Sequence, residues 1–310
     1  MLKKKIIFMG TPEISAIYLN YLIQENFNII SVVTQPAKKK GRGLIKQESA
    51  VHKISKINKI NVFTPLNLND KEFKSKVHNL NPDLIIVMGY GLKLPDFILN
   101  IPKFGCINVH VSLLPRWRGA APIEYSLLNG DKKTGITIFK VVEKMDAGPI
   151  LINQSIEIEE NINKDELTDK LNLIGTKLLN QVLPNIFNNK VVYKNQVEDQ
   201  ITYAPKISTD LRKINFYEDM EVIHNKIRAF SFRPGAWFNY EKEINKIIKS
   251  QKIKGDFEPS LILNDRFHIG CNDGKICPEI IQRAGKKPMF LEEFLRGFKF
   301  KIGSQLNVKI

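Results

Sequence analysis

Residues 4–22 read KKIIFMGTPEISAIYLNYL, and this stretch decides the class of fold. Its first part, Lys4 to Gly10, is an apolar run typical of a buried strand. Thr11 and Pro12 then predict the start of a helix, with Thr11 as the N-cap and Pro12 in the first turn. The residues that follow place apolar side chains on one helical face, at Ile14, Ile17, Tyr18, Tyr21 and Leu22. A buried strand followed directly by such a helix is the building unit of α/β folds.

The same alternation of strands and helices continues through the first half of the chain. Further strands are expected at 27–35, 61–63, 83–89, 105–111 and 136–142, with helices at 50–58 and 70–79. Strands of continuous Ile and Val between helices are typical of a parallel sheet that is covered on both faces. We therefore predict an α/β fold with a doubly wound, mostly parallel, Rossmann-like sheet. In such a sheet the ligand site lies at the carboxyl ends of the strands.

The second half of the chain does not continue this alternation of strands and helices. A long amphipathic helix at 164–187 is followed by a polar, Asn-rich stretch that is typical of a linker. Beyond it, a helix at 219–230 precedes short strand-like pieces, and Asn272-Asp273-Gly274 predicts a hairpin. These features favour a small β-barrel of the oligonucleotide-binding (OB-like) type. The predicted domains are residues 1–188, a linker at 189–205, and residues 206–310.

Composition limits the class of protein. The net charge of +15 favours a polyanionic partner, although solvated lysines need none. Residues 206–310 hold 20 Lys and Arg against 13 Asp and Glu, so positive charge is denser there. Three cysteines without a CxxC spacing suit a reducing cytoplasm and argue against a structural zinc site. The longest apolar stretch, 84–94, is too short to cross a bilayer, and no signal-peptide cleavage site follows the N-terminus. We expect a cytoplasmic protein with no membrane partner.

The candidate chemistry lies in residues 105–122, GCINVHVSLLPRWRGAAP. Asn108 and His110 stand two residues apart near the end of a predicted strand, so their side chains share one face. An imidazole exchanges a proton near neutral pH, and a neighbouring amide can donate to a developing oxyanion. Asp146 lies on a turn between two later strands and can meet them at the same sheet edge. Taken alone, these residues are more typical of a structural histidine, a turn-capping asparagine and a turn aspartate than of catalytic groups.

The pattern Asn108-x-His110 followed by SLLPRWRG, with Asp146 further on, resembles the signature of the folate-dependent formyltransferase family. Flanking stretches match the branch of the family that acts on charged initiator tRNA. These stretches are GTPE, TQPAKKKGRG, GYGLKLP, YAPKIS, IRAFSFRPGAW and AGKKPMFLEEFLRG, and they run from one end of the chain to the other.

The resemblance implies 10-formyltetrahydrofolate as the formyl donor and the α-amino group of methionyl initiator tRNA as the acceptor. It implies Asn108, His110 and Asp146 as the catalytic residues, with no permanently bound cofactor and no metal. Asn108 and His110 would stabilise the oxyanion, while Asp146 would orient His110 and help to move the proton. The folate contacts that it implies are Tyr90, Gly91, Leu92, Ser112, Leu113, Leu114, Pro115, Arg118, Gly119 and Val142.

The resemblance also implies a tRNA contact at the basic stretch after the second strand, which we expect to be a mobile loop. Lysine and arginine supply the phosphate contacts by which RNA helices are bound. The residues implied are Lys38, Lys39, Lys40, Arg42 and Lys46, together with Lys206 in the YAPKIS stretch. Nothing in the sequence indicates an obligate interface, so a monomer is expected.

Four alternatives remain open at this point. A glycinamide ribonucleotide formyltransferase would share the central signature but end near residue 200. A sugar-nucleotide formyltransferase can carry a similar second domain but needs no basic loop. A formyltetrahydrofolate hydrolase would use water as the acceptor. An RNA-binding protein without catalytic activity would have no need of Asn108, His110 and Asp146.

Overall fold

The structure is a computed structural model that describes residues 4–40, 45–241 and 243–306. Its internal contacts divide the chain into two compact units. The first unit comprises Met1–Ala120, Gly135–Ile156 and Lys170–Ala204, and the second comprises Ala121–Thr134, Glu157–Asp169 and Pro205–Ile310. This division by contacts differs from the domain boundaries expected at 188 and 206, and those boundaries stay a prediction.

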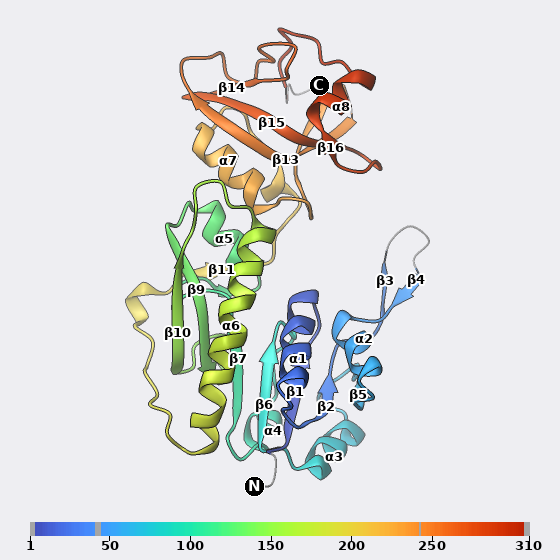
Figure 1. The fold of residues 1–310 in the computed structure, drawn as a ribbon, viewed down its shortest axis with the longest axis vertical. Helices are drawn as coiled ribbons and strands as arrows, with labels where there is room; N and C mark the ends of the chain where they lie inside the picture. Colours follow the sequence, from blue (N-terminus) through green and yellow to red (C-terminus); the bar gives the residue numbers. More distant parts are fainter. Residues whose placement is uncertain (1–3, 41–44, 242, 307–310) are drawn as a thin grey trace. The chain divides into compact units, whose positions relative to one another are not determined.

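A seven-stranded sheet forms the centre of the first unit, in the order β10-β9-β7-β6-β1-β2-β5 (Figure 1). The pairs from β7 to β5 are parallel, whereas β9 pairs antiparallel with β7. The predicted α/β fold with a mostly parallel sheet is confirmed. The strands are β1 (Ile6–Gly10), β2 (Ile29–Val33), β5 (Val62–Phe63), β6 (Leu84–Met88), β7 (Cys106–His110), β9 (Lys133–Lys140) and β10 (Ile150–Glu157).

Helices cover both faces of this sheet, which is why its central strands carry apolar residues at every position. On one face, Ile7 and Met9 of β1 pack with Phe73 and Val77 of α3 and with Ile98 of α4. Across the other face lie α1 and α6 (Figure 1). The helices up to this point of the chain are α1 (Glu13–Gln24), α2 (Ala50–Ile57), α3 (Lys71–Leu80), α4 (Asp96–Asn100), α5 (Pro122–Leu128) and α6 (Lys164–Phe187).

Helix α1 begins one residue later than the sequence pattern predicts. Pro12 occupies the N-cap, without a side-chain capping bond, so the prediction of Thr11 as N-cap was wrong. The Thr11 hydroxyl instead donates to the carbonyl of Tyr90 and accepts from the backbone N–H of Gln35, both at 3.4 Å. Thr11 therefore ties together the loops that follow β1, β2 and β6, at the carboxyl edge of the sheet.

The second unit is built on an antiparallel sheet in the order β12-β13-β15-β14, with β16 paired to β15. Asn272-Asp273-Gly274 connects β14 to β15, as predicted for a hairpin. The apolar core of this unit includes a stacked pair, Phe267 and Phe300. Its elements are α7 (Met220–Ala229), β12 (Ala236–Tyr240), β13 (Glu243–Lys254), β14 (Ile269–Cys271), β15 (Gly274–Arg283), β16 (Met289–Phe290) and α8 (Leu291–Gly297).

Two earlier stretches of the chain belong to this second unit. Helix α5 packs on α7, and the segment just before α6 is bound by a buried arginine. The guanidinium of Arg228 donates to the carbonyls of Glu159 and Ile162, each at 3.4 Å. Lys252 forms an ion pair with Glu160 at 3.1 Å and another with Glu221. The segment before α6, together with Lys164 in the first turn, whose ammonium donates to the Arg233 carbonyl, is thus bound to residues about 65 to 90 positions further along the chain.

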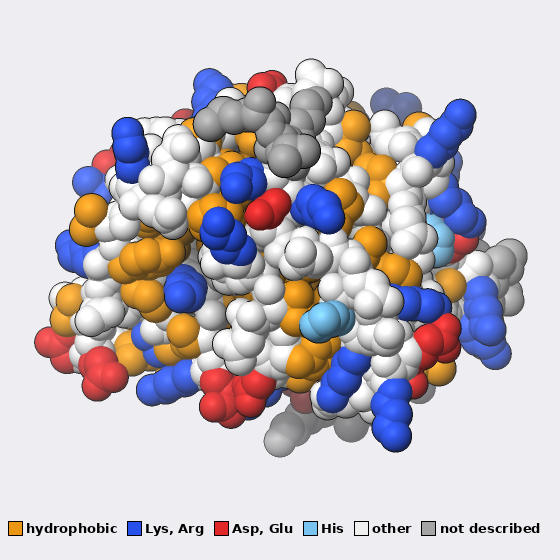
Figure 2. All heavy atoms as spheres, turned by 90° about the horizontal axis from the view of Figure 1, so that it is seen from below, with side chains coloured by type: hydrophobic (Ala, Val, Ile, Leu, Met, Phe, Trp, Pro, Cys, Tyr) orange, Lys and Arg blue, Asp and Glu red, His pale blue; other side chains and the backbone are white. Residues whose placement is uncertain are grey.

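Charged side chains are dispersed over the face of the molecule that is seen from below in Figure 2. Lysine and arginine side chains stand among acidic and apolar ones on this face and do not gather into one patch (Figure 2). In the described part of the chain, no helix is both long enough and apolar enough to cross a membrane.

The second unit contains a titratable group whose effect on stability can be measured. His224 is buried, its Nδ1 lies 3.2 Å from the hydroxyl of Ser250, and burial lowers its pKa from 6.5 to about 4. The cations Lys252 and Arg228 lower this pKa further, whereas Glu221 and Glu160 oppose them. Between pH 6.5 and pH 4 the unfolded chain therefore binds a proton that the native protein does not bind.

We predict that the free energy of unfolding falls as the pH drops through this window, by at most about 3 kcal/mol from this group. His224→Asn keeps a partner for Ser250 but does not titrate, so its stability should depend less on pH over the same range. Urea unfolding of both proteins at several pH values measures the difference. Equal pH dependence of the two proteins would contradict the prediction.

Candidate active site

Asn108 and His110 lie at the carboxyl end of β7, on the same face of the strand, as the spacing predicts. In the sheet register, Asn108 stands opposite Phe139 of β9 and His110 stands opposite Thr137. His110 is only 6% exposed, and its ring meets the ring of Phe139 edge-on. The side-chain oxygen of Asn108 is buried and has no hydrogen-bond partner among the described residues. The strand end thus presents an amide whose oxygen is unpaired beside a nearly buried imidazole.

The imidazole is held by a main-chain group. Its Nε2 lies 2.9 Å from the carbonyl oxygen of Trp117, and because a carbonyl only accepts, Nε2 carries the hydrogen. In the neutral ring Nδ1 is then the proton acceptor, and it lies 3.9 Å from Oδ2 of Asp146. That Asp146 orients the ring stays a prediction. The contact that fixes the tautomer is with Trp117, while the Asp146 carboxylate stands where it stabilises a proton on Nδ1.

Asp146 lies on the turn between β9 and β10, in the left-handed region with φ of 48°. Its Oδ2 accepts a hydrogen bond of 2.8 Å from the backbone N–H of Gly119. The carboxylate is largely buried, with 13% of the side chain exposed. The structure therefore brings Asn108, His110, Asp146 and Gly119 together at one end of β7 and β9. This cluster is the candidate active site.

The loop that carries Trp117 is pinned by a segment far along the chain. Trp117 N–H donates to the hydroxyl of Thr202, and Arg118 N–H donates to the Thr202 carbonyl, both at 2.9 Å. The strands β8 (Arg118–Gly119) and β11 (Tyr203–Ala204) then pair in parallel. Residues 196–204 lie in the stretch that was expected to be a linker, yet they form one wall of the site.

Gln196 and Thr202 are site residues that the sequence interpretation missed. Thr202 directly precedes the YAPKIS stretch, which was one signal of its place. Gln196 lies in a polar stretch without periodicity, and no pattern marks it. Its side chain bonds to Arg118 and to the turn of Asp146.

The expected folate contacts fall into several places. Leu113, Leu114 and Pro115 line a cavity of about 560 Å³ together with residues 199–202. The turn that carries them is fixed by Thr137, whose hydroxyl donates to the carbonyl of Ser112 and accepts from Leu114 N–H. Arg118 is buried, and its guanidinium is bonded to Gln196.

The loop after β6 carries the next group of expected contacts. The Tyr90 side chain is buried, its hydroxyl has no partner among the described residues, and burial raises its pKa to about 12. Its carbonyl accepts a hydrogen bond of 2.7 Å from the side chain of Gln35. Gly91 has φ of 83°, and Leu92 is half exposed.

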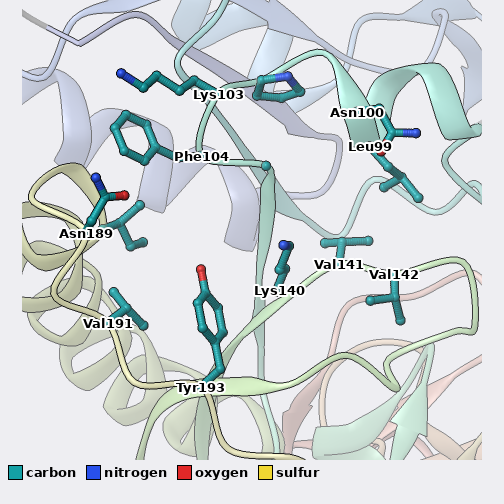
Figure 3. Close-up of a pocket in the computed structure, with 13 residues that line it drawn as sticks. Leu99, Asn100, Lys103, Phe104, Lys140, Val141, Val142, Asn189, Val191 and Tyr193 are labelled. Carbon is teal, nitrogen blue, oxygen red and sulfur yellow. The ribbon is translucent and has the colours of Figure 1, made fainter.

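Val142 lies elsewhere, on the wall of a cavity of about 510 Å³ at the amino end of β7 (Figure 3). Phe104, Lys140 and Tyr193 also line this cavity, and the Lys140 ammonium stands 5.8 Å from the centre of the Tyr193 ring. Asn108, His110 and Asp146 do not line it. Whether Val142 contacts a folate stays a prediction.

The basic stretch after β2 contains a short antiparallel pair of strands, the hairpin of β3 (Lys38–Lys40) and β4 (Ile45–Gln47), where we expected a loop. In this pair Lys39 stands directly opposite Lys46. The expected mobility of the loop rests on Gly41 and Gly43, which lie outside the described residues. Lys40 lies in β3, whereas Arg42 lies outside the described residues. The ammonium of Lys38 donates to the side chain of Gln35 at 2.5 Å. Lys206 is exposed and belongs to the second unit.

A metal centre was not expected from the sequence. Among the described residues, no group of three His, Cys, Asp or Glu side chains is arranged to hold a metal ion.

Two family models match this chain. Residues 4–183 match the model described as "Formyl transferase", and residues 206–299 match the model described as "Formyl transferase, C-terminal domain". Together the two matches span most of the sequence.

Curated relatives are similar over nearly their whole length. The methionyl-tRNA formyltransferase of Sinorhizobium fredii is 38% identical over 307 residues, which cover 97% of this chain and 99% of the relative. That of Ehrlichia canis is 42% identical over 300 residues, which cover 95% of this chain and 97% of the relative.

Solved structures share the fold at lower identity. An N-formyltransferase from Helicobacter canadensis, in complex with folinic acid and dTDP-3-aminofucose, matches with a TM-score of 0.67 and 23% identity over 91% of this chain and 100% of the other. HypX from Aquifex aeolicus, in complex with tetrahydrofolic acid, matches with a TM-score of 0.67 and 16% identity over 99% of this chain and 51% of the other.

Proposed function

This chain belongs to the formyl transferase family, and we propose that it transfers the formyl group of 10-formyltetrahydrofolate to the α-amino group of methionyl initiator tRNA. The observation that carries the proposal is the cluster of Asn108, His110 and Asp146 at the end of β7 and β9. Relatives named for this activity are similar along the whole chain. Two solved structures that share the fold are complexes with a folate derivative.

The reaction joins the α-nitrogen of the acceptor to the formyl carbon and breaks the bond from that carbon to N10 of the folate. A proton leaves the attacking amine, and N10 gains a proton as it departs. The carbonyl oxygen of the formyl group bears negative charge in between, so the site needs a hydrogen-bond donor and a place to hold a proton.

The residues of the cluster match these needs. The Asn108 side chain, whose oxygen has no partner among the described residues, would donate to the oxyanion through the N–H groups of its Nδ2. Nδ1 of His110 accepts the proton, because Trp117 keeps the other ring nitrogen protonated. The Asp146 carboxylate, 3.9 Å away and largely buried, faces the positive charge that the ring would carry with this proton. Asp146 retains its own position through Gly119 N–H.

The acceptor tRNA would contact the β3–β4 hairpin. Two like charges directly opposite each other on paired strands destabilise the pair, and Lys39 and Lys46 stand in this relation. A phosphate group between them would offset that repulsion. In this proposal residues 1–188 carry out the chemistry, and residues 206–310, which are denser in positive charge and include Lys206, bind the tRNA. The protein would act as a cytoplasmic monomer.

An assay with several acceptors tests the proposal. The purified protein and 10-formyltetrahydrofolate are incubated with methionyl initiator tRNA, charged elongator tRNA, free methionine or dTDP-3-aminofucose. Formyl-methionyl initiator tRNA should be the main product. Formylation of the amino sugar would instead indicate a sugar-nucleotide enzyme, and donor consumption without a formylated product would indicate a hydrolase.

Substitutions of His110 should separate catalysis from tRNA binding. His110→Gln retains an N–H donor for the Trp117 carbonyl but has no titratable nitrogen at the Nδ1 position. We expect both His110→Gln and His110→Ala to lower kcat by about 10²- to 10⁴-fold, the range for loss of a general acid–base group. The dissociation constant for tRNA, measured by filter binding, should stay within about twofold. Near-normal turnover of either variant would refute the role assigned to His110.

Removing the paired lysines should affect binding and not chemistry. For Lys39→Ala and Lys46→Ala we expect weaker tRNA binding and a shallower dependence of affinity on salt, by about one unit of slope for each phosphate that is no longer neutralised. The value of kcat at saturating tRNA should change little. Lys177→Ala, an exposed lysine on α6, serves as the matched control. Unchanged affinity and slope in both hairpin variants would exclude the hairpin from tRNA binding.

A further inference from the structure

Gln196 uses its entire side-chain amide within the protein. Its Nε2 donates to the carbonyl of Asp146 and to the carbonyl of Gly148, each at 2.8 Å. Its Oε1 accepts from Nε of Arg118 at 3.1 Å and from Nη2 of Arg118 at 2.7 Å. An amide has two donor hydrogens and one oxygen that accepts twice, so this side chain is saturated. No other uncharged side chain of this length supplies two N–H hydrogens together with an oxygen that accepts two hydrogen bonds.

These bonds close a ring around the carboxylate of the active site. Gln196 binds the backbone of the Asp146 turn on one side and Arg118 on the other. The residue after Arg118 is Gly119, whose N–H binds Oδ2 of Asp146. The Asp146 residue is therefore fixed twice, through its carbonyl by Gln196 and through its carboxylate by Gly119.

The turn needs such support because its backbone is unfavourable. A left-handed conformation at a residue other than glycine costs on the order of 1 kcal/mol, and Asp146 adopts it with φ of 48°. The surrounding structure must outweigh this cost to keep the carboxylate beside His110. Two hydrogen bonds to carbonyls on either side of Ala147 do so locally.

We propose that Gln196 is a positioning residue for formyl transfer, which acts by holding Asp146 against Nδ1 of His110. The role rests on the proposed function of the cluster. Gln196 touches neither substrate in this role. It comes from the segment after α6, so the same contact also ties residues 196–204 to the reacting end of β7.

Kinetics of Gln196 variants provide the first test. Gln196→Ala removes all four hydrogen bonds, and we expect kcat to fall by about 10- to 100-fold, since a misplacement of about 1 Å costs this much. The KM values for donor and tRNA should change by less than about twofold. Asn195→Ala, at the neighbouring position with an exposed side chain, should behave as the unchanged protein. A kcat for Gln196→Ala within threefold of the unchanged protein would overturn the proposal.

The isosteric variant Gln196→Glu keeps the oxygen for Arg118 but turns a carboxylate oxygen toward two carbonyl oxygens. It should lose activity at neutral pH and regain part of it at low pH, where the protonated acid again has an O–H to donate. The loss in Gln196→Ala should not depend on pH in this way. Because this variant preserves shape, it decides the question if Gln196→Ala does not fold. Full activity of Gln196→Glu at neutral pH would overturn the proposal.

A double-mutant cycle tests whether Gln196 acts through Asp146. In an Asp146→Asn background, measured in single turnover with excess enzyme, adding Gln196→Ala should change the rate by less than about twofold. A further loss equal to that seen in the unchanged background would show that Gln196 acts by another route.

A measurement without substrate separates this inference from the proposed function. The Gly119 amide should exchange its hydrogen faster in Gln196→Ala, and its proton signal should move upfield, as in Asp146→Ala and unlike Asn195→Ala. An unchanged Gly119 amide would overturn the positioning role. A protein that shows these shifts but does not formylate methionyl-tRNA would instead overturn the proposed function.

Discussion

The parallel pairing of β8 with β11 is the constraint on which the site depends. Only two residues of each strand take part, yet they join the loop after β7 to a segment more than 80 positions later. Once Arg118 and Gly119 are fixed against Tyr203 and Ala204, the Trp117 carbonyl faces His110 and the Gly119 N–H faces Asp146. A short contact between distant segments thus sets the positions of both titratable groups.

The fold could be predicted from the sequence because its strands are buried on both sides. A strand such as β1 carries apolar residues at every position, and few other environments require this. The antiparallel pairing of β9 could not be predicted so directly, since its apolar run resembles that of a parallel strand. What makes it antiparallel is its pairing with β7, a property of the assembled sheet. The hairpin of Lys38 to Gln47 escaped prediction because its lysines resemble a solvated loop.

The candidate site could be predicted only where side chains form a local pattern. Asn108 and His110 stand two apart at the end of a strand, and that spacing alone puts them on one face. The groups that hold His110 and Asp146 are mostly main-chain atoms, namely the Trp117 carbonyl, the Gly119 N–H and the Asp146 carbonyl that accepts from Gln196. Every residue has such atoms, so no choice of residue reveals which of them are used. Gln196 was hidden for a related reason, because a glutamine in a polar stretch is ordinarily solvated.

A site held by main-chain groups depends on close approach of backbones more than on particular side chains. At Gly119 a Cβ would lie 2.6 Å from the carbonyl oxygen of Ala204, so the pairing of β8 with β11 requires glycine there. At Gly148 a Cβ would lie 1.7 Å from the Lys140 carbonyl, which the turn of Asp146 must pass. Both glycines also supply a group that supports Asp146. The N–H of Gly119 binds Oδ2 of Asp146, and the carbonyl of Gly148 accepts a hydrogen bond from Gln196. The position of Asp146 therefore depends on two close approaches of the backbone, that of Gly119 to Ala204 and that of Gly148 to Lys140. The side chain of Gln196 connects the two places, because it binds both Arg118 and the turn of Asp146.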